Sequence, residues 1–234
     1  MSNQCVVMNS ADERQRVQVQ AAEIVAEQRT LTGAGARCKN GARVRIRRQF
    51  KGASGPYVLT LARALRDTQD GRWFSYCLVR YHPAAFESLD QAQVEACGQG
   101  MDDKDMVDSF ARILAGPAWV RGLISDALIH RWAYSEDHWW RRAALVSTVA
   151  LNTRGDGGVG DTPRTLAVCR LLASDRDETV TSALVWALRA LAHYDAQAVY
   201  AFVAEQEGQL AAQVHREVTQ ALEAGSRHRG RGAG

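Results

Sequence analysis

An almost continuous succession of helix-forming segments, separated by short breaks, is the feature that most constrains this chain. Strand-like alternation occurs only at residues 43–47, which is too short to carry a sheet. Residues 33–55 are rich in Gly and Arg, and we predict that they are partly irregular. The segments predicted to be helical are 10–28 (with Ser10 as candidate cap), 56–67, 72–81, 83–97, 102–114, 119–134, 136–152, 163–173, 178–193, 196–205 and 210–224.

The helices recur in pairs. Helices that begin near residues 102, 136 and 178 are each followed by a second helix, which gives a period of roughly 35 to 40 residues, close to that of HEAT repeats. We therefore predict an all-α, HEAT-like helical repeat solenoid with a concave basic face, and a plain helical bundle is the alternative. We expect residues 1–224 to form a single domain and residues 225–234 to be a disordered basic tail.

Positive charge is concentrated in one part of the sequence, although the net charge of the whole chain is only +3. From residue 28 to residue 66 there is no Asp or Glu. A local positive field of this kind suits a polyanion such as nucleic acid. The basic residues of the stretch are Arg29, Arg37, Lys39, Arg43, Arg45, Arg47, Arg48, Lys51, Arg63 and Arg66.

Several classes of protein are disfavoured by the sequence. The five cysteines are odd in number and widely spaced, which argues against a disulfide framework or a zinc site. No apolar run is long enough to span a membrane, and the N-terminus lacks the apolar core of a signal peptide. We expect a monomeric cytoplasmic protein, associated with the nucleoid, that uses no metal and no cofactor.

The run Gly155–Gly160 matches G-x-G-x-x-G, but a predicted helix precedes it where the dinucleotide fingerprint needs a strand. We interpret the run as a loop between helices, with Asp161 or Thr162 as N-cap and Pro163 as the first helical residue. The six histidines have no metal-ligand spacing. We expect His82 and His130 to be capping or core-edge residues.

Three positions are candidates for function, and each has a structural alternative. Asp108 lies four residues from both Lys104 and Arg112, so it could belong to a solvated salt-bridge face. Arg142 shares a stripe with apolar residues and needs a partner, which could be a phosphate or a neighbouring carboxylate. Trp186 stands among small residues and could contact a base or sugar, or pack against the next repeat.

Several short segments occur in an order that resembles the AlkD-type DNA alkylation repair family, a set of HEAT-like repeat DNA glycosylases. The resemblance runs from about Arg47 to Leu222. The segments are RRQFKG at 47–52, DMVDSFARILAG at 105–116, WAYSEDHWWRRAAL at 132–145, VWALR at 185–189 and RE at 216–217.

The resemblance implies a function and a set of site residues. It implies excision of positively charged N3- or N7-alkylated purines from duplex DNA, without flipping the base into a deep pocket. Asp108 matches the functionally central acid, which would stabilise the cationic sugar or position water. Arg142 matches a DNA-contacting Arg, with Arg141 as the alternative in register, and Trp186 matches one of two aromatic residues that face the lesion.

Lys104 stands where the family has the second aromatic residue. Lying one helical turn before Asp108, Lys104 could pair with that acid, contact a DNA phosphate, or attack an abasic sugar as a Schiff-base amine, and we rank these roles in that order. We expect the remaining DNA contacts to come from the basic stretch that includes Arg45, Arg47 and Arg48. The rival hypothesis is a non-catalytic helical-repeat scaffold that binds DNA or a protein partner.

Overall fold

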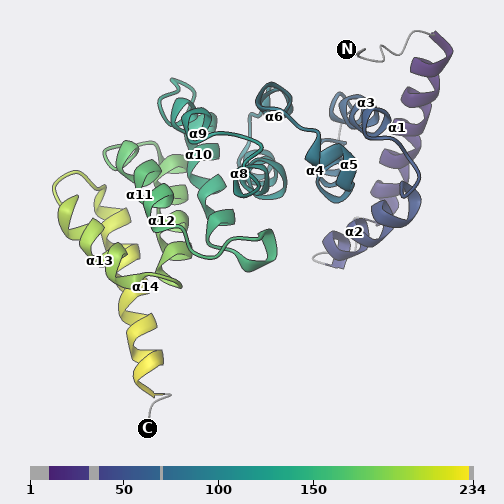
Figure 1. Cartoon of the computed structure of the whole chain (residues 1–234). Coiled ribbons are helices and arrows are strands. Elements are labelled where there is room, and N and C mark those ends of the chain that lie inside the picture. Colours follow the sequence, from purple (N-terminus) through teal and green to yellow (C-terminus); the bar gives the residue numbers. More distant parts are fainter. Residues whose placement is uncertain (1–10, 32–36, 69–70, 232–234) are drawn as a thin grey trace, which may run out of the picture. The chain divides into compact units, whose positions relative to one another are not determined.

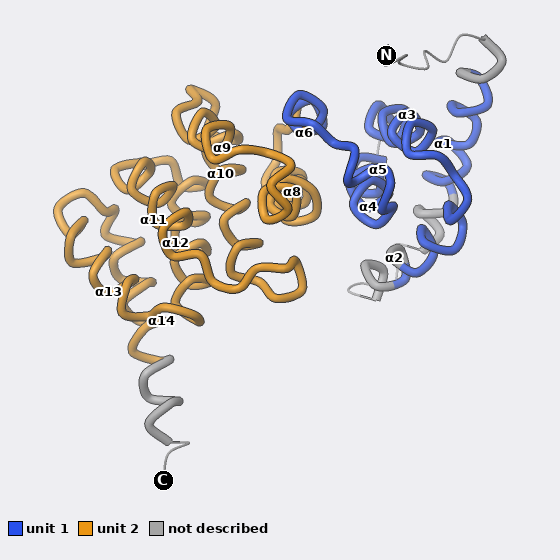
Figure 2. The backbone as a smooth tube through the Cα atoms, in the orientation of Figure 1, with its two compact units in different colours: residues 1–97 blue, residues 98–234 orange. Residues whose placement is uncertain are grey.

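The computed structural model describes residues 11–31, 37–68 and 71–231, and every regular element in these ranges is a helix (Figure 1). The prediction of an all-α fold built from helical repeats is therefore confirmed. The chain forms two compact units, residues 1–97 and 98–234 (Figure 2), and the expectation that residues 1–224 form a single domain stays a prediction.

The first unit is built around α3 (Gly55–Arg66), which packs against α1 (Ala11–Leu31) and α4 (Arg72–Tyr81). Helix α2 (Arg37–Gln49) contacts α4, α5 (Pro83–Glu87) contacts both α3 and α4, and the unit also includes most of α6 (Gln91–Gly98). Residues 83–97, expected as one helix, are split because Asp90 and Gln93 form a capping box. The Asp90 amide donates to the Gln93 side chain at 3.0 Å, and the Gln93 amide donates to the Asp90 carboxylate at 2.8 Å.

Helix α2 corrects the expectation of partly irregular structure with strand-like alternation around residues 43–47. Ile46 and Phe50 are four residues apart and are both buried, so a helical face sets the local structure despite the alternating Val and Ile. The Phe50 amide donates to the Ile46 carbonyl at 3.0 Å, which continues this turn. The candidate cap Ser10 and the side chains of Arg29, Arg37, Lys39 and Arg43 lie outside the described residues.

The second unit stacks successive helix pairs, in which the first helices begin at residues 126, 162 and 196 and so recur every 34 to 36 residues. The second helices, α10, α12 and α14, contact one another in sequence, and α9 packs on α11 (Figure 1). The pairs are α9 (Asp126–Ala133) with α10 (His138–Leu151), α11 (Thr162–Leu171) with α12 (Glu178–Ala192), and α13 (Ala196–Glu205) with α14 (Ala212–Arg231). The period agrees with the prediction, although the helices predicted near 136 and 178 are the second members of their pairs.

Helix α14 continues to Arg231, into the stretch for which composition predicts disorder, and residues 232–234 lie outside the described part. The loop interpretation of the Gly155–Gly160 run is confirmed. Gly157 and Gly160 have φ of 90° and 91°, and the Asp161 side chain caps α11 by accepting from the Arg164 amide at 3.0 Å.

The predicted helix stop at Gly116-Pro117 is wrong. Helix α7 (Lys104–Ser109) runs into a π-helical segment, η2 (Phe110–Ala115), and then into α8 (Gly116–Val120), which holds Pro117 in its first turn. The Gly116 amide bonds to the Ala111 carbonyl, and the wider turn accommodates a proline ring that would clash in an α-helix. Gly116 is required here because an added Cβ would come within 2.8 Å of the Ser147 carbonyl oxygen of α10.

The helix predicted over residues 119–134 is also interrupted. Gly122 has a φ of 71°, and its amide donates to the Trp119 carbonyl at 3.0 Å while the Leu123 amide donates to the Ala118 carbonyl at 2.9 Å. This is a Schellman C-terminus, for which the left-handed glycine is the ordinary residue. Ser125 then caps α9.

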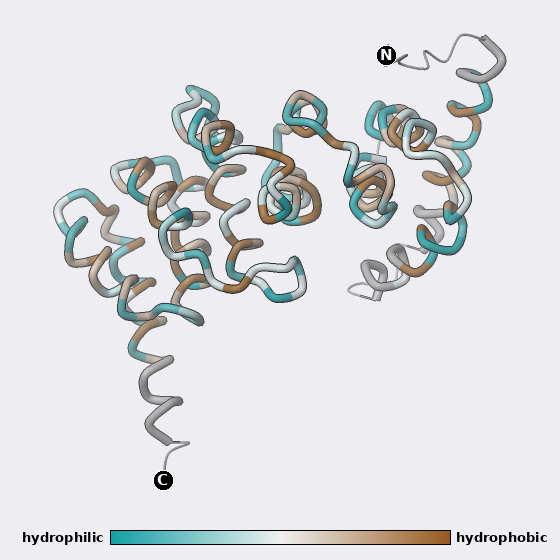
Figure 3. Tube along the Cα trace, viewed as in Figure 1, coloured by the Kyte–Doolittle hydropathy of each residue, from teal (hydrophilic) through white to brown (hydrophobic). Residues whose placement is uncertain are grey.

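Helix α10 lies at the centre of the second unit and contacts α8, α9, α11 and α12. Every residue from Arg142 to Leu151 is buried. Along α10 and the helices that it contacts, hydrophobic residues recur and alternate with hydrophilic ones (Figure 3). Because one of the buried residues is an arginine, the core must supply it with polar partners.

Candidate functional site

A bidentate ion pair joins Asp108 of α7 to Arg142 of α10. The Arg142 Nε donates to Asp108 Oδ1 and its Nη2 donates to Asp108 Oδ2, both at 2.8 Å. The Arg142 side chain is 1 % exposed, whereas that of Asp108 is 20 % exposed. The carboxylate is thus held in one orientation from the core side while part of it remains accessible to solvent.

The remaining partners of Arg142 are on α12. Its Nη1 donates to the Thr179 carbonyl and, at 2.9 Å, to the Ser182 hydroxyl. Of the two partners that the sequence left open for Arg142, the structure therefore contains the carboxylate. Since its guanidinium is buried and bonded, Arg142 holds Asp108 in place, and the phosphate contact implied by the resemblance stays a prediction. The solvated salt-bridge face considered for Asp108 is not what the structure contains.

The first turn of α12 is fixed by its N-cap, Asp177. The Asp177 carboxylate accepts from the amides of Thr179 at 2.8 Å and Val180 at 3.3 Å. Burial opposes ionisation, but the hydrogen bonds from Thr179 and Val180 outweigh it and leave the pKa of Asp177 below its ordinary 3.8. The cap therefore places the Thr179 carbonyl that receives Arg142.

An open groove of about 540 Å³ lies beside this ion-pair system, within the second unit. Trp186 is half-buried in its wall, and Ser182, which is bonded to Arg142, also lines it. The Arg112 guanidinium lies over the Trp186 ring, with its central carbon 5.3 Å from the ring centroid. The other lining residues are Val149, Asn152, Thr153, Val185, Arg189, Ala190, His193 and Glu217.

Three rings on neighbouring elements position the Asp108 helix. The Phe110 ring lies 5.7 Å from Trp132 of α9 and 5.9 Å from Trp140 of α10, measured between centroids, and the two tryptophans are 4.9 Å apart. Such clusters favour tilted and edge-on geometry and add to the burial free energy of large apolar surfaces. Phe110 follows Asp108 by two residues, so this packing anchors the start of the π-helical segment.

Arg141, the alternative in register to Arg142, has a different position. Its Nε donates to Asp175 at 2.7 Å, and its Nη1 donates to the carbonyls of Ser135 at 3.0 Å and Glu136 at 2.8 Å. Arg141 therefore ties the start of α10 to the loop that precedes α12. A DNA contact by Arg141 stays a prediction.

Lys104 is exposed at the first residue of α7. Within the described ranges no hydrogen bond or ion pair joins Lys104 to another residue, so the pairing with Asp108 that we ranked first is not formed. Asp108 is bonded to Arg142 instead. The Lys104 amine stays available, and its contact with a phosphate or a sugar stays a prediction.

The predicted basic contacts of the first unit are not equivalent. Arg47 and Arg48 are exposed on α2. Arg45 is half-buried and lies over the Phe74 ring, with 5.6 Å between its guanidinium carbon and the ring centroid. The exposed pair is better placed for phosphate, and the binding of DNA by all three residues stays a prediction.

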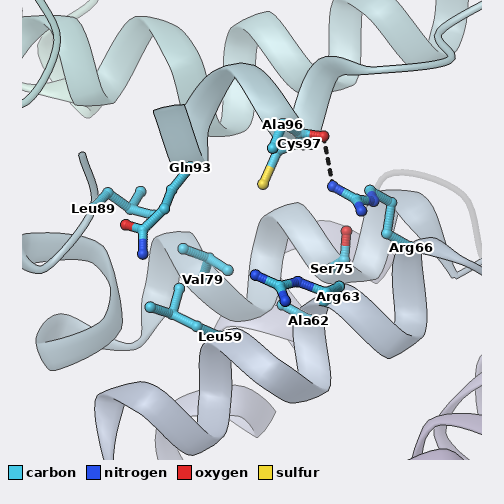
Figure 4. A pocket seen from close by; sticks show the side chains of 10 residues that line it. All are labelled: Leu59, Ala62, Arg63, Arg66, Ser75, Val79, Leu89, Gln93, Ala96 and Cys97. Carbon is cyan, nitrogen blue, oxygen red and sulfur yellow. Dashed lines mark hydrogen bonds between the residues drawn. The ribbon is translucent and has the colours of Figure 1, made fainter. Parts of the chain in front are cut away.

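A separate pocket of about 280 Å³ lies in the first unit between α3, α4 and α6 (Figure 4). Apolar side chains such as Leu59, Val79 and Leu89 line it together with the polar side chains of Arg63, Arg66 and Gln93. Arg66 donates to the Ala96 carbonyl at 2.5 Å. No Asp or Glu lines this pocket, and none of its lining residues is bonded to the Asp108–Arg142 pair, whereas Ser182 in the groove of the second unit is bonded to Arg142. The groove of the second unit is therefore the better candidate.

Sequence reasoning missed the residues that support Asp108 from a distance. The caps were detectable, because Asp177 precedes Thr179 and Val180 in a common N-terminal pattern. Arg112 was noted only as a neighbour of Asp108, and its position over Trp186 had no sequence signal. The prediction that His82 is a capping residue is confirmed, since its Nδ1 accepts from the Ala85 amide at 3.2 Å.

The part of the chain that the structure describes contains no group of three or more His, Cys, Asp or Glu side chains arranged to hold a metal ion. Among the same residues no helix is both long and apolar enough to cross a membrane. Cys169 is buried, and burial raises the pKa of its thiol to about 12.

Comparison with protein families gives one finding that covers both units. The sequence model of the family described as DNA alkylation repair enzyme matches residues 14–222. The chain belongs to this family. It is therefore an enzyme of DNA repair that acts on alkylated DNA, and the matched region contains the Asp108–Arg142 pair and the Trp186 groove. Comparisons with curated proteins and with solved structures gave no match.

Proposed function

We propose that this DNA alkylation repair enzyme is a monofunctional DNA glycosylase that hydrolyses the N-glycosidic bond of N3- and N7-alkylated purines in duplex DNA. Asp108 acts at the sugar, Arg142 positions Asp108, and Trp186 contacts the damaged nucleotide. The exposed Arg47 and Arg48 bind phosphate as part of a basic face.

The chemistry of the substrate explains why one carboxylate is enough. An N3- or N7-alkylated purine already carries a positive charge, so it leaves without being protonated. As the glycosidic bond breaks, positive charge develops on the sugar. A carboxylate fixed nearby stabilises that charge and accepts a proton from the attacking water.

The orientation of Asp108 is the observation that supports this proposal. Arg142 occupies one hydrogen-bonding position on each carboxylate oxygen, both at 2.8 Å, and each oxygen has a second position left over. The Asp108 side chain is 20 % exposed, so it is not sealed in the core. A preorganised acid of this kind needs little rearrangement when the sugar cation forms.

The proposal is tested by incubating the protein with a duplex that carries one 7-methylguanine. The expected products are free 7-methylguanine and an abasic strand that stays intact until alkali is added. Release of no base would contradict the proposal, and strand cleavage without alkali would contradict the monofunctional assignment.

The alternative is a repair protein that binds alkylated DNA without cutting the glycosidic bond. One observation favours it: the residue one turn before Asp108 is the exposed Lys104 and not an aromatic residue that could contact the lesion. In that case the protein would bind the 7-methylguanine duplex more tightly than an unmodified one, yet release no base.

A further inference from the structure

The face of Trp186 is already occupied by a cation of the protein itself. The Arg112 guanidinium carbon lies 5.3 Å from the Trp186 ring centroid, inside the range in which a cation is attracted to an indole. Both side chains line the same groove. The substrate proposed above is a cationic base, so the protein presents an internal cation at a position where the lesion's charge would be favoured.

Arg112 is held there by weak interactions. Its ion pair with Asp156 joins Nη2 to the carboxylate at 3.7 Å, which is too long for a good charge-assisted hydrogen bond. Its Nε is buried and has no hydrogen-bond partner among the described residues. A buried donor without a partner is unfavourable, so a conformation in which Arg112 reaches an acceptor would be preferred when one arrives.

Arg112 lies in the π-helical segment η2, close in sequence to Asp108 but not bonded to it. Arg112 lies four residues after Asp108 but is paired with Asp156 rather than with that acid, which is committed to Arg142. Arg112 therefore makes no contact on which the Asp108–Arg142 ion pair depends. π-Helical turns occur frequently at functional sites.

We propose that Arg112 and the damaged base exchange places on Trp186. In free protein Arg112 covers the ring; when damaged DNA binds, the cationic base takes over the ring and Arg112 moves to a phosphate oxygen. The ring keeps a cation throughout, and Arg112 gains the acceptor that its Nε lacks. An unmodified base offers the ring no charge and leaves Arg112 in place. Arg112 is thus a specificity residue, and this inference rests on the proposed function.

The exchange is followed by ¹⁹F NMR on protein labelled with 5-fluorotryptophan. The Trp186 resonance is assigned by its loss in Trp186→Phe. The lesion duplex carries one 7-methylguanine on a 2′-fluorinated sugar, because the fluorine destabilises the sugar cation and slows base release. The resonance should move in Arg112→Met, and in the parent it should move with the lesion duplex but not with an unmodified one. Equal shifts with both duplexes, or none, would overturn the exchange.

The affinities of the protein for lesion and unmodified duplexes give a second test of the exchange. In Arg112→Met the ratio of affinities for lesion and unmodified duplex should fall about two- to five-fold, because an unmodified base can then reach the ring and the phosphate contact that Arg112 makes only with the lesion is lost. The matched control Arg189→Met removes an exposed cation from the same groove and should weaken both duplexes alike, leaving the ratio unchanged. An unchanged or higher ratio in Arg112→Met would contradict the inference.

These results separate the inference from the proposed function. A shift of the Trp186 resonance specific to the lesion, with no release of base from an ordinary 7-methylguanine duplex, would support the exchange and reject the glycosylase. Release of base with no such shift would reject the exchange on Trp186 and support the proposed glycosylase function.

Discussion

Arg142 donates two hydrogen bonds of 2.8 Å to the carboxylate of Asp108, a residue 34 positions away in the sequence. Arg142 is buried in the core and Asp108 lies at the edge of the core, so the buried arginine fixes the orientation of the carboxylate. This ion pair, together with the helices that hold it, should therefore govern both the stability and the activity of the second unit.

Removing the buried arginine should destabilise the fold. In Arg142→Met, Asp108, the Thr179 carbonyl and Ser182 all lose a charged partner, and we expect the free energy of unfolding to fall by about 3 kcal/mol. Urea titration followed by circular dichroism measures this. Arg189→Met, at an exposed position, should change it by less than about 0.5 kcal/mol. Similar values for the two variants would mean that the ion pair contributes little.

The cap of α12 should make stability depend on pH in the acid range. Because hydrogen bonds lower the pKa of Asp177 below 3.8, its contribution is present above the pKa of the unfolded chain and is lost as pH falls through the lower folded value. Asp177→Ala should cost about 1 kcal/mol at pH 7. The difference from the parent should shrink below about pH 4. A difference that is constant from pH 7 to pH 3 would show that the charge of Asp177 is not what stabilises the helix.

DNA binding should depend on salt through the exposed arginines of α2. Between about 50 and 200 mM salt the affinity for duplex DNA should fall steeply, because phosphate contacts release counterions. Arg47→Gln with Arg48→Gln should reduce the slope of log affinity against log salt by roughly one for each phosphate that is no longer bound. Arg45→Gln should change the slope less, since Arg45 lies over Phe74. A double variant with the parent's slope would exclude α2 from the interface.

Lys104 offers a test of the departure from the family pattern. Because Lys104 is exposed and is not bonded to Asp108, Lys104→Trp should leave the Asp108–Arg142 pair intact and, on the family analogy, raise excision of cationic purines. Borohydride trapping on abasic DNA tests the third role considered for this residue. A covalent adduct that disappears in Lys104→Ala would establish a Schiff base, and reduced excision in Lys104→Trp would show that the site depends on the lysine.

The sequence predicts helices well where local signals bound them. Arg72–Tyr81 and Ala196–Glu205 have the predicted bounds, and α12 ends within one residue of its prediction. It failed at Pro117, where a π-helical segment absorbs a residue that normally ends a helix, and at residues 33–55, where the burial of Ile46 and Phe50 outweighs Gly and Arg content.

The site was only partly predictable for a different reason. Asp108, Arg142 and Trp186 are identified by short motifs, but which partner satisfies Arg142 depends on packing between helices far apart in sequence. Helical periodicity shows that Arg142 faces the core and needs a partner, and it cannot choose between phosphate and Asp108. Likewise, nothing local in the sequence places Arg112 over Trp186.

The role of Asp108 is the central claim, and single-turnover release of 7-methylguanine from duplex DNA tests it most directly. Asp108→Asn keeps the size of the side chain but removes its charge, so the rate should fall about 100- to 1,000-fold while DNA affinity changes little. Asp105→Asn, an exposed acid on the same helix, is the matched control and should release base at the parent's rate. Asp108→Asn releasing base as fast as the parent would contradict the account.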